Sequence, residues 1–435
     1  MAESKKPNIL IFVPHDLGQH LGCYGMDTVD TENIDRLASE GVRFENSFCT
    51  APQCSPSRAS IFTGRYPHSN GVMGLTHDGF AWDLHDTERH LSGILSEHGW
   101  HSTLAGGAHE TRKPERMGFD QILPAEDELG DACVDFLSGE KGHSRPFFLE
   151  IQMGFTHRSR IGFGSKPYDE KGVEVPDYLV DDPSCQEDLA YFQGAVNKQD
   201  RFVGRILNAL EESGLEGETM VIFTADHGAP FPRAKCSVYD PGLEVPLIVK
   251  WPEGPWKPGN VYKPLVSNVD YLPTLLDLLN LHLPKNVQGK SHAPLLSGDR
   301  DDYSPREEIF GEMTYHDYYD PRRCIRTEEY KLIVNFSMAH SFMDPSQSWE
   351  RKCRTVQPEN PPYAYHPLLE LYDLNDDPLE FENLVGKDSH QELLEDLIKR
   401  LDVWMEDTED SLLEGVPLSP THKEALQALG DRLFE

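Results

Sequence analysis

Three short segments of the chain are apolar at almost every position, at residues 8–13, 146–152 and 220–225. Strands at the centre of a parallel sheet are buried on both faces, so they show continuous apolar runs rather than strict alternation. Helical patterns alternate with these segments, at residues 33–40, 91–98 and 188–213. The alternation predicts a doubly wound α/β fold, mostly parallel, with its ligand site at the carboxyl ends of the strands.

The pattern changes after about Leu296. Shorter strand-like pieces follow at residues 308–310, 324–327, 331–336 and 370–373, interrupted by a polar, Pro-rich stretch over residues 343–367. A helical pattern covers residues 391–406, and the chain ends in a further helical segment. We therefore expect an α/β domain over residues 1–300 and a smaller α+β subdomain with a small antiparallel sheet over residues 301–435.

The net charge of the chain limits the classes of molecule that the protein is expected to bind. The 435 residues include 40 Lys and Arg against 74 Asp and Glu, a formal net charge of −34. A nucleic-acid binder is disfavoured because phosphate contacts need clustered Lys and Arg, whereas a local basic pocket is still able to hold one small anion. The eight cysteines show no CxxC pairing, and no apolar stretch has signal-peptide or membrane-span form. We expect a cytoplasmic protein with no membrane partner, no zinc knuckle and no disulfide framework.

Two acidic centres follow strands of the predicted sheet. His15 and Asp16 come after the first strand, and Asp226 and His227 come after the third. Carboxylates at such strand ends are natural ligands for a hard cation. Each Asp taken alone is more simply a residue that caps the next turn. The two centres together, each with a His beside its Asp, favour a metal site.

The most specific local motif is Cys54-Ser55-Pro56-Ser57-Arg58. Pro56 is tolerated in the first turn of a helix, so Cys54 is expected at a helix start, where backbone N–H groups favour an anion. The same position activates a thiolate, and Arg58 lies one turn along the same face. For an arbitrary cysteine, a buried packing role would be the better interpretation.

This motif, followed by Ala59-Ser60 and Thr63-Gly64, resembles the signature of type I (formylglycine-dependent) sulfatases in the alkaline phosphatase superfamily. The segments His15-Asp16-Leu17-Gly18 and Thr224-Ala225-Asp226-His227-Gly228 resemble further elements of that family. Pro230 to Lys235 and Thr314 to Asp317 are most similar to its heparan N-sulfatase (sulfamidase) branch. The resemblance implies an alkaline-phosphatase-like fold and hydrolysis of a sulfate ester or N-sulfate of a sulfated sugar such as N-sulfoglucosamine, with release of inorganic sulfate.

The resemblance also assigns residues. Cys54 would be oxidised to formylglycine (3-oxoalanine) by a formylglycine-generating maturation enzyme, and its hydrate would attack sulfur. One divalent metal, usually Ca²⁺, would be held by Asp16, Asp226, His227, Cys54 and, in this chain, His15. Arg58 would stabilise the aldehyde hydrate, while His109, His157 and Lys235 would contact the sulfate or the leaving group. A His near the leaving atom suits a general acid because its pKa lies near working pH. His316 and Asp317 would line the substrate pocket.

Two departures from the family pattern keep alternatives open. His15 stands where the family has Asp, which would move the metal preference toward Mn²⁺ or Zn²⁺, unless His15 turns away. Gly107 stands where the family has Lys, so a contact is lost unless Lys113, Arg112 or Arg158 replaces it. A phosphodiester or phosphonate monoester hydrolase of the same superfamily, and a non-catalytic binding protein on this fold, therefore remain possible interpretations.

The acidic surface favours small sulfated saccharides over long polymers, because a chain of sulfates would be repelled outside the pocket. Arg322 and Arg323 would either meet a sugar acid or form surface ion pairs of little energetic weight. The acidic run at residues 406–414 is most simply a solvated terminus.

Overall fold

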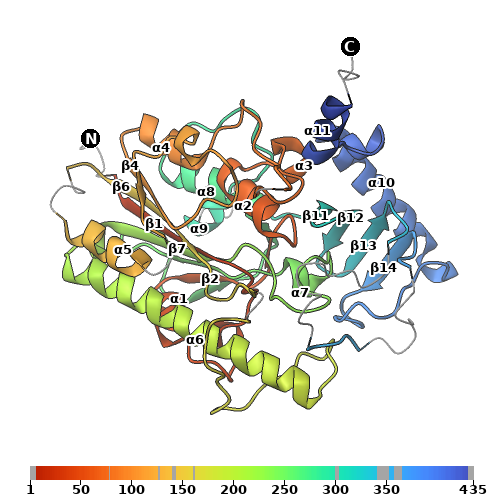
Figure 1. Cartoon of the computed structure of the whole chain (residues 1–435), viewed down its shortest axis with the longest axis horizontal. Coiled ribbons are helices and arrows are strands. Elements are labelled where there is room, and N and C mark those ends of the chain that lie inside the picture. The colour runs from red at the N-terminus through yellow and green to blue at the C-terminus, as the bar shows by residue number, and fades with distance from the viewer. Residues whose placement is uncertain are drawn as a thin grey trace.

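The computed structural model describes residues 6–77, 79–125, 128–139, 144–159, 162–298, 303–339, 352–356 and 365–429 (Figure 1). A large sheet occupies one side of the molecule, and a smaller antiparallel sheet lies beside it. The chain therefore folds as a large α/β unit followed by a smaller α+β unit.

The large sheet has eight strands. Their order is β5 (Gln121–Leu123), β4 (His101–Ala105), β6 (Phe147–Met153), β1 (Asn8–Pro14), β7 (Thr219–Thr224), β8 (Leu247–Lys250), β2 (Val42–Phe44) and β9 (Asn260–Tyr262). β8 runs antiparallel to both of its neighbours, and the other pairs are parallel. The predicted doubly wound, mostly parallel sheet is confirmed, because β4, β6, β1 and β7 form a parallel centre. A two-stranded parallel ribbon, β3 (Ser47–Phe48) with β10 (Val266–Ser267), lies outside this sheet.

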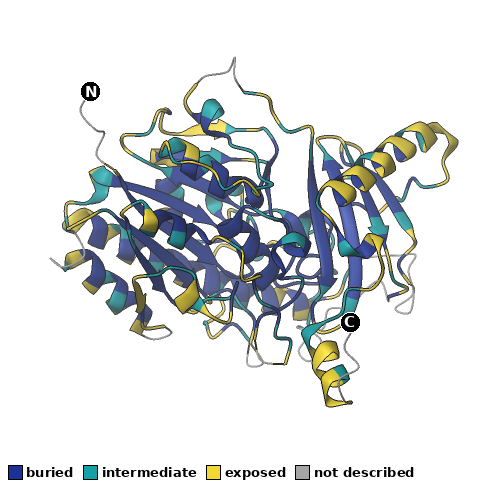
Figure 2. Ribbon diagram, turned by 90° about the horizontal axis from the view of Figure 1, so that it is seen from above, coloured by how far each residue is buried: buried dark blue, intermediate teal, exposed yellow. Residues whose placement is uncertain are grey.

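Two layers of helices cover the sheet, because the side chains of each buried strand point alternately to its two faces. One layer consists of α1 (Glu32–Glu40), α5 (Leu129–Ser138) and the 30-residue α6 (Pro183–Glu212). The other contains α2 (Cys54–Thr63), α4 (Leu91–Glu97) and α8 (Tyr271–Leu278). Along β1, Leu10 and Phe12 pack on the first layer, whereas Ile9 and Ile11 pack on the second. Figure 2 shows this interior as a continuous buried region.

The smaller sheet has the antiparallel order β11 (Glu308–Tyr315), β12 (Tyr319–Thr327), β13 (Tyr330–Asn335) and β14 (Leu369–Asp373). Its apolar face packs against α10 (Gln391–Asp407). Leu394, Leu397 and Leu401 recur along α10 at helical spacing and contact that face. The remaining helices are α3 (Pro67–Asn70), α7 (Asp240–Leu243), α9 (Ala293–Leu296) and α11 (Pro420–Ala428). The small antiparallel sheet expected in the C-terminal part is therefore present.

The structure extends several predicted elements. α6 begins at Pro183, five residues before the predicted start, because Asp182 caps its N-terminus by accepting from the backbone N–H groups of Ser184 and Cys185. Much of the Pro-rich stretch at residues 343–367 lies outside the described residues.

The domain division at residue 300 stays a prediction. In the described part of the chain, no helix is both long and apolar enough to cross a membrane.

Candidate active site

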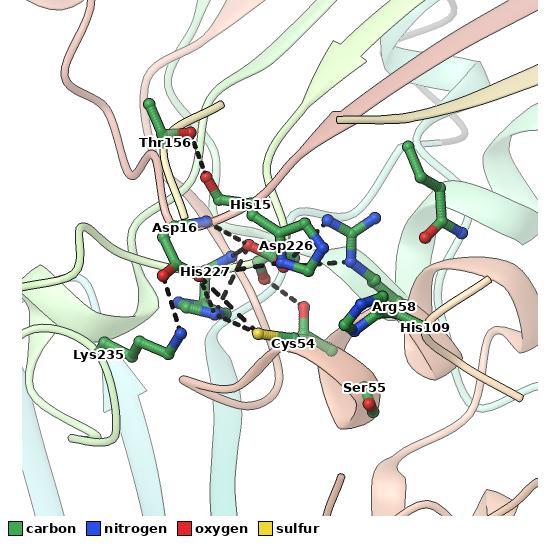
Figure 3. A network of polar contacts seen from close by, with 12 residues as sticks. His15, Asp16, Cys54, Ser55, Arg58, His109, Thr156, Asp226, His227 and Lys235 are labelled. Carbon is green, nitrogen blue, oxygen red and sulfur yellow. Dashed lines mark hydrogen bonds and ion pairs between the residues drawn. The ribbon is translucent and has the colours of Figure 1, made fainter. Parts of the chain in front are cut away.

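The candidate site lies where four neighbouring parallel strands end. His109 follows β4, His157 follows β6, His15 follows β1 and Asp226 follows β7. Because these strands are adjacent in the order β4, β6, β1, β7, their carboxyl ends meet at one edge of the sheet. Figure 3 shows His15, His109 and Asp226 converging there with Cys54.

Cys54 is the first residue of α2, as the sequence predicts. Gln53, just before it, has an extended backbone, and Pro56 is accommodated in the first turn because its missing N–H has no helical partner to lose. The hydroxyl of Ser57 donates to the carbonyl oxygen of Asp226, and the side-chain N–H of Asn268 donates to that hydroxyl at 2.9 Å. These contacts fix the start of α2 against the end of β7, with Cys54 buried between them.

Two buried carboxylates face Cys54. The backbone N–H of Asp16 donates to Asp226 Oδ1 at 2.8 Å, which locks the ends of β1 and β7 together. Asp16 has a φ of 51°, a left-handed conformation that Asp tolerates better than most residues. Lys235 Nζ lies 2.8 Å from Asp16 Oδ2, and Arg58 Nε donates to Asp226 Oδ2 at 3.1 Å. Each carboxylate therefore has a fixed cation beside it.

Two histidines complete the centre. His227 Nε2 lies 3.1 Å from Asp16 Oδ1 and 3.4 Å from Cys54 Sγ, while its Nδ1 donates to the Gly228 carbonyl oxygen at 2.9 Å. That bond places a proton on Nδ1 and aims Nε2 at the carboxylate and the thiol. His15 Nδ1 lies 3.0 Å from Asp226 Oδ2, so His15 faces the centre and does not turn away.

The donors at this centre fit a divalent cation. One ligand atom each from His15, Asp16, Cys54 and Asp226 lies within 4.8 Å of the others, and all four residues are buried. Two carboxylates suit a hard ion such as Ca²⁺, and the imidazole of His15 adds a donor preferred by Mn²⁺ or Zn²⁺. His227 is positioned to contribute Nε2, because its other ring nitrogen is held by a carbonyl.

The charges of the centre favour an anion at position 54. Burial by itself raises the pKa of the Cys54 thiol, but the charges of Lys235 and His227 outweigh it and hold that pKa well below its usual value. Burial likewise opposes ionisation of Asp16 and Asp226, yet neighbouring cations keep the pKa of both carboxyls low. The site thus stabilises negative charge inside a strongly acidic protein.

His109 and His157 lie beside His15, with ring centroids 4.5 Å and 5.3 Å from it. Burial lowers the pKa of His109 well below its usual value and that of His157 to about 4. These low pKa values differ from the expected pKa near working pH, because both rings are buried and lie near cationic groups. As neutral imidazoles they donate a hydrogen bond or accept a proton.

One of the three proposed substitutes for the missing lysine is engaged elsewhere. A side chain at Gly107 would meet no atom within 4 Å, so the position is open. Arg158 is committed elsewhere, because its two terminal nitrogens lie 2.8 Å and 2.6 Å from the carboxylate of Asp188. Substitution by Arg158 is therefore wrong. Substitution by Lys113 or Arg112 stays a prediction.

His316 and Asp317 follow β11, and the end of that strand is hydrogen-bonded to the residue before α2. Gln53 Nε2 donates to the Tyr315 carbonyl oxygen at 2.7 Å, which joins this segment to the residue before Cys54. His316 is buried, and its Nδ1 lies 3.0 Å from Asp317 Oδ2. The segment therefore lies beside the nucleophile position, where a substrate pocket would need it. The expected surface ion pairs of Arg322 and Arg323 are wrong, since both residues are buried.

Sequence reasoning missed several residues around the site. His77 packs edge-on against His109, with ring centroids 5.5 Å apart. Glu110, the residue after His109, and Glu150 are fully buried, and Gln152 Nε2 donates to their carboxyl groups at 2.8 Å and 2.6 Å. Burial raises the pKa of both carboxyls, and Glu110 raises that of Glu150 further. The sequence contains one indication of Glu150, because a charged residue in the middle of an apolar strand is unusual.

Known protein families match this chain over most of its length. A family model described as Sulfatase matches residues 7–126 and 123–281. A second model, described as N-sulphoglucosamine sulphohydrolase, C-terminal, matches residues 233–350. The first match contains His15, Asp16, Cys54, Arg58, His109, His157, Asp226, His227 and Lys235.

Individual relatives agree with these matches. The chain is 28% identical to N-sulphoglucosamine sulphohydrolase of Homo sapiens, with 94% of this chain and 92% of that protein covered. It is 29% identical to an ulvan-active sulfatase of Formosa agariphila, with 96% and 84% covered. Among solved structures, a 2-O GAG sulfatase has a TM-score of 0.73 at 23% identity, with 96% of each chain covered. A protein in complex with its substrate D-glucosamine-2-N,6-O-disulfate has a TM-score of 0.70 at 20% identity, with 93% and 99% covered.

Proposed function

The chain belongs to the sulfatase family, and on this basis we propose that it removes sulfate from a small sulfated saccharide, as an N-sulfate (sulfamate) or a sulfate ester. The observation that carries the proposal is the position of Cys54, at the start of α2 and within reach of Asp16, Asp226 and His227. A nucleophile at that position faces buried cations, which suit a sulfate group.

The proposal needs Cys54 in its formylglycine form, made by a maturation enzyme. The hydrated aldehyde supplies an oxygen nucleophile with a second hydroxyl for release of sulfate. Arg58 is buried one turn along α2, where it orients and stabilises that hydrate. Asp16, Asp226, His15, His227 and residue 54 would hold a divalent metal, which would offset the negative charge of the nucleophile and the sulfate oxygens.

The remaining residues bind the sulfate and handle the leaving group. Lys235 places a positive charge next to Asp16 and residue 54, in position to pair with a sulfate oxygen. His109 and His157 are neutral, so they bind sulfate oxygens through N–H donation, and the negative charge of bound sulfate raises their pKa toward the range of a general acid.

The sugar specificity is drawn from the relatives. The match to the C-terminal model of N-sulphoglucosamine sulphohydrolase supports an N-sulfated glucosamine as the first substrate to test. His316 and Asp317 would contact that sugar, because their segment joins the start of α2. The net charge of −34 favours a disaccharide over an intact polymer at low salt.

The first experiment is peptide mass spectrometry across Phe44 to Arg58, on protein co-expressed with a formylglycine-generating enzyme and alkylated beforehand. We expect an aldehyde at residue 54 and an alkylated Cys49 in the same peptide. Release of inorganic sulfate from N-sulfoglucosamine and from 6-O-sulfated glucosamine is then measured with Ca²⁺, Mn²⁺ or Zn²⁺ added. Cys54→Ala should lower kcat/KM at least about 10³-fold, whereas Cys133→Ala, a buried cysteine on α5, should keep it.

The outcomes separate the competing functions. Aldehyde formation with faster cleavage of aryl phosphodiesters than of any sulfate would point to the phosphodiester or phosphonate hydrolase. Alkylated Cys54 without turnover would point to a non-catalytic binding protein.

A further inference from the structure

Two cysteines that are 168 positions apart in the chain meet in the interior. Cys185 lies in the first turn of α6, and Cys353 lies in the short described segment 352–356. Their Sγ atoms are 2.8 Å apart, and both side chains are at most 1% exposed. In Figure 1 the segment 352–356, drawn between two grey stretches, runs beside the beginning of α6.

The backbone on both sides of the pair is held independently of the sulfurs. Leu179 and Thr355 form an antiparallel bridge. The Val180 N–H donates to the Arg354 carbonyl oxygen at 2.7 Å, and the Val356 N–H donates to the Tyr178 carbonyl oxygen at 2.9 Å. The segment before α6 and segment 352–356 are thus joined like two strands, and this pairing sets the two cysteines opposite one another.

Ion pairs reinforce the same alignment. Arg354 Nη2 lies 2.6 Å from Asp182 Oδ2, and Lys352 Nζ lies 3.2 Å from Glu187 Oε2. Both acidic partners flank Cys185 in sequence, and both cations flank Cys353. The two side chains therefore face each other without any backbone movement, which is the condition a disulfide requires.

A shared metal ion does not explain the contact. Two thiolates bound to one tetrahedral zinc, at about 2.3 Å each, lie roughly 3.8 Å apart, well beyond the observed separation. Two separate thiols are not stabilised by so close an approach either, because a thiol is a weak hydrogen-bond donor and a weak acceptor. A bonded pair, with sulfurs at about 2.05 Å, is reached by a shift of under 1 Å.

We propose that Cys185 and Cys353 form a disulfide that ties α6, which packs on the large sheet, to the chain between β13 and β14 of the small sheet. The bond forms by thiol–disulfide exchange with a small disulfide such as oxidised glutathione, or with a disulfide oxidoreductase. The two thiols give up two protons and two electrons as the S–S bond forms, and the partner disulfide takes them up as two thiols.

The cysteine pair is also connected to the segment that carries His157. Cys353 Sγ lies 3.6 Å from Asp188 Oδ2, and both oxygens of Asp188 bind Arg158, the residue after His157. Both sulfurs are buried, so a disulfide in solution reaches them poorly after folding, and the bond forms as the chain folds.

The decisive test is peptide mapping of the full-length protein refolded with oxidised glutathione. The protein is alkylated while denatured and not reduced, then digested with a protease that cleaves after glutamate. We expect one linked peptide pair containing Cys185 and Cys353, which separates on reduction. Alkylation of both residues under these conditions would overturn the proposal, and this measurement needs no variant.

Thermal unfolding tests the consequence of the bond. Because the bond closes a long loop, adding a reductant should lower the Tm of the oxidised protein by about 5 °C or more. The double variant Cys185→Ser, Cys353→Ser should show no such fall, whereas Cys133→Ser should retain it. A fall of equal size in the double variant would assign the effect to other thiols and contradict the proposal.

Discussion

The buried residues around Cys54 show how a protein of net charge −34 creates a local preference for an anion. Arg58 and Lys235 are almost fully buried, so water screens their charges weakly. Asp16 and Asp226 pair with them, yet the pKa of Cys54 is still lowered. The few charges that are buried together around Cys54 therefore set the sign of the local electrostatic potential. The net charge of the whole chain does not.

Glu150 is a buried carboxyl near the site, and its pKa is shifted in the opposite direction from those of Asp16 and Asp226. Its Oε1 accepts from Gln152, its Oε2 has no hydrogen-bond partner among the residues that the structure describes, and the carboxyl of Glu110 lies nearby. Burial raises the pKa of Glu150 above its usual value. The folded state therefore keeps a proton that the unfolded chain releases above pH about 4.3.

A Glu150→Gln substitution should stabilise the protein increasingly as pH rises. For a carboxyl with a raised folded pKa, stability falls as pH rises above the unfolded pKa, because only the unfolded state releases the proton. The variant lacks this penalty, so its unfolding free energy relative to the parent should increase by about 1–3 kcal/mol between pH 5 and pH 8. Urea unfolding at both pH values measures it. The exposed Glu211→Gln on α6 should change stability by less than about 0.5 kcal/mol at either pH, and an equal response of both variants would contradict the argument.

At the scale of elements, the turn after β4 places His109. Gly106 has a φ of +94°, and a Cβ there would lie 2.4 Å from the backbone oxygen of Gln152 in β6. The neighbouring Gly107 has open space around it and no left-handed backbone. Only the first glycine is therefore required by the close approach of the two strands.

We expect Gly106→Ala to destabilise the protein by about 1–3 kcal/mol, because the new methyl group meets backbone atoms that have little room to move. Its desulfation rate should fall as well, since the turn that carries His109 must shift. Gly107→Ala is the matched control and should leave the unfolding midpoint in urea nearly unchanged. Equal midpoints for the two variants would show that the turn does not need the left-handed glycine.

At the scale of the whole molecule, a buried ionic network joins the large and small units. His68 of α3 binds Glu312 of β11 at 2.9 Å, and Arg323 of β12 lies 3.2 Å from the same carboxylate. Arg323 also binds both oxygens of Asp410, which follows α10. The expectation of a solvated acidic run is therefore wrong at Asp410, whose side chain is fully buried. The network links α3 to the last part of the small unit.

Asp410→Asn should lower the unfolding free energy by about 1.5–3 kcal/mol, because Arg323 loses its bidentate partner and keeps Glu312, which lies 3.2 Å away. Thermal or urea unfolding measures the loss. Asp396→Asn removes an exposed partner of Arg400, 3.3 Å away along α10, and should cost less than about 0.5 kcal/mol. If the two variants lost similar amounts of unfolding free energy, the network would contribute no more than an exposed ion pair.

Much of the architecture follows from local sequence patterns. The continuous apolar runs of β1, β6 and β7 predict buried parallel strands, because a strand covered on both faces has no polar side to show. Cys54 is correctly expected at a helix start, because Pro56 restricts the backbone through its immediate neighbours. The residues of the candidate site also follow from short motifs, read through the resemblance to the sulfatases.

Contacts between distant parts of the chain were decided only by the tertiary structure. The sequence contains 19 histidines, and packing alone determines that His77 lies beside His109 while His68 joins an ionic network. Packing likewise buries Asp410 and Arg323 together and brings Cys185 to Cys353. The physical reason is that patterns along the chain record which residues avoid water, whereas pairing and pKa depend on neighbours that are tens to hundreds of positions away in the sequence.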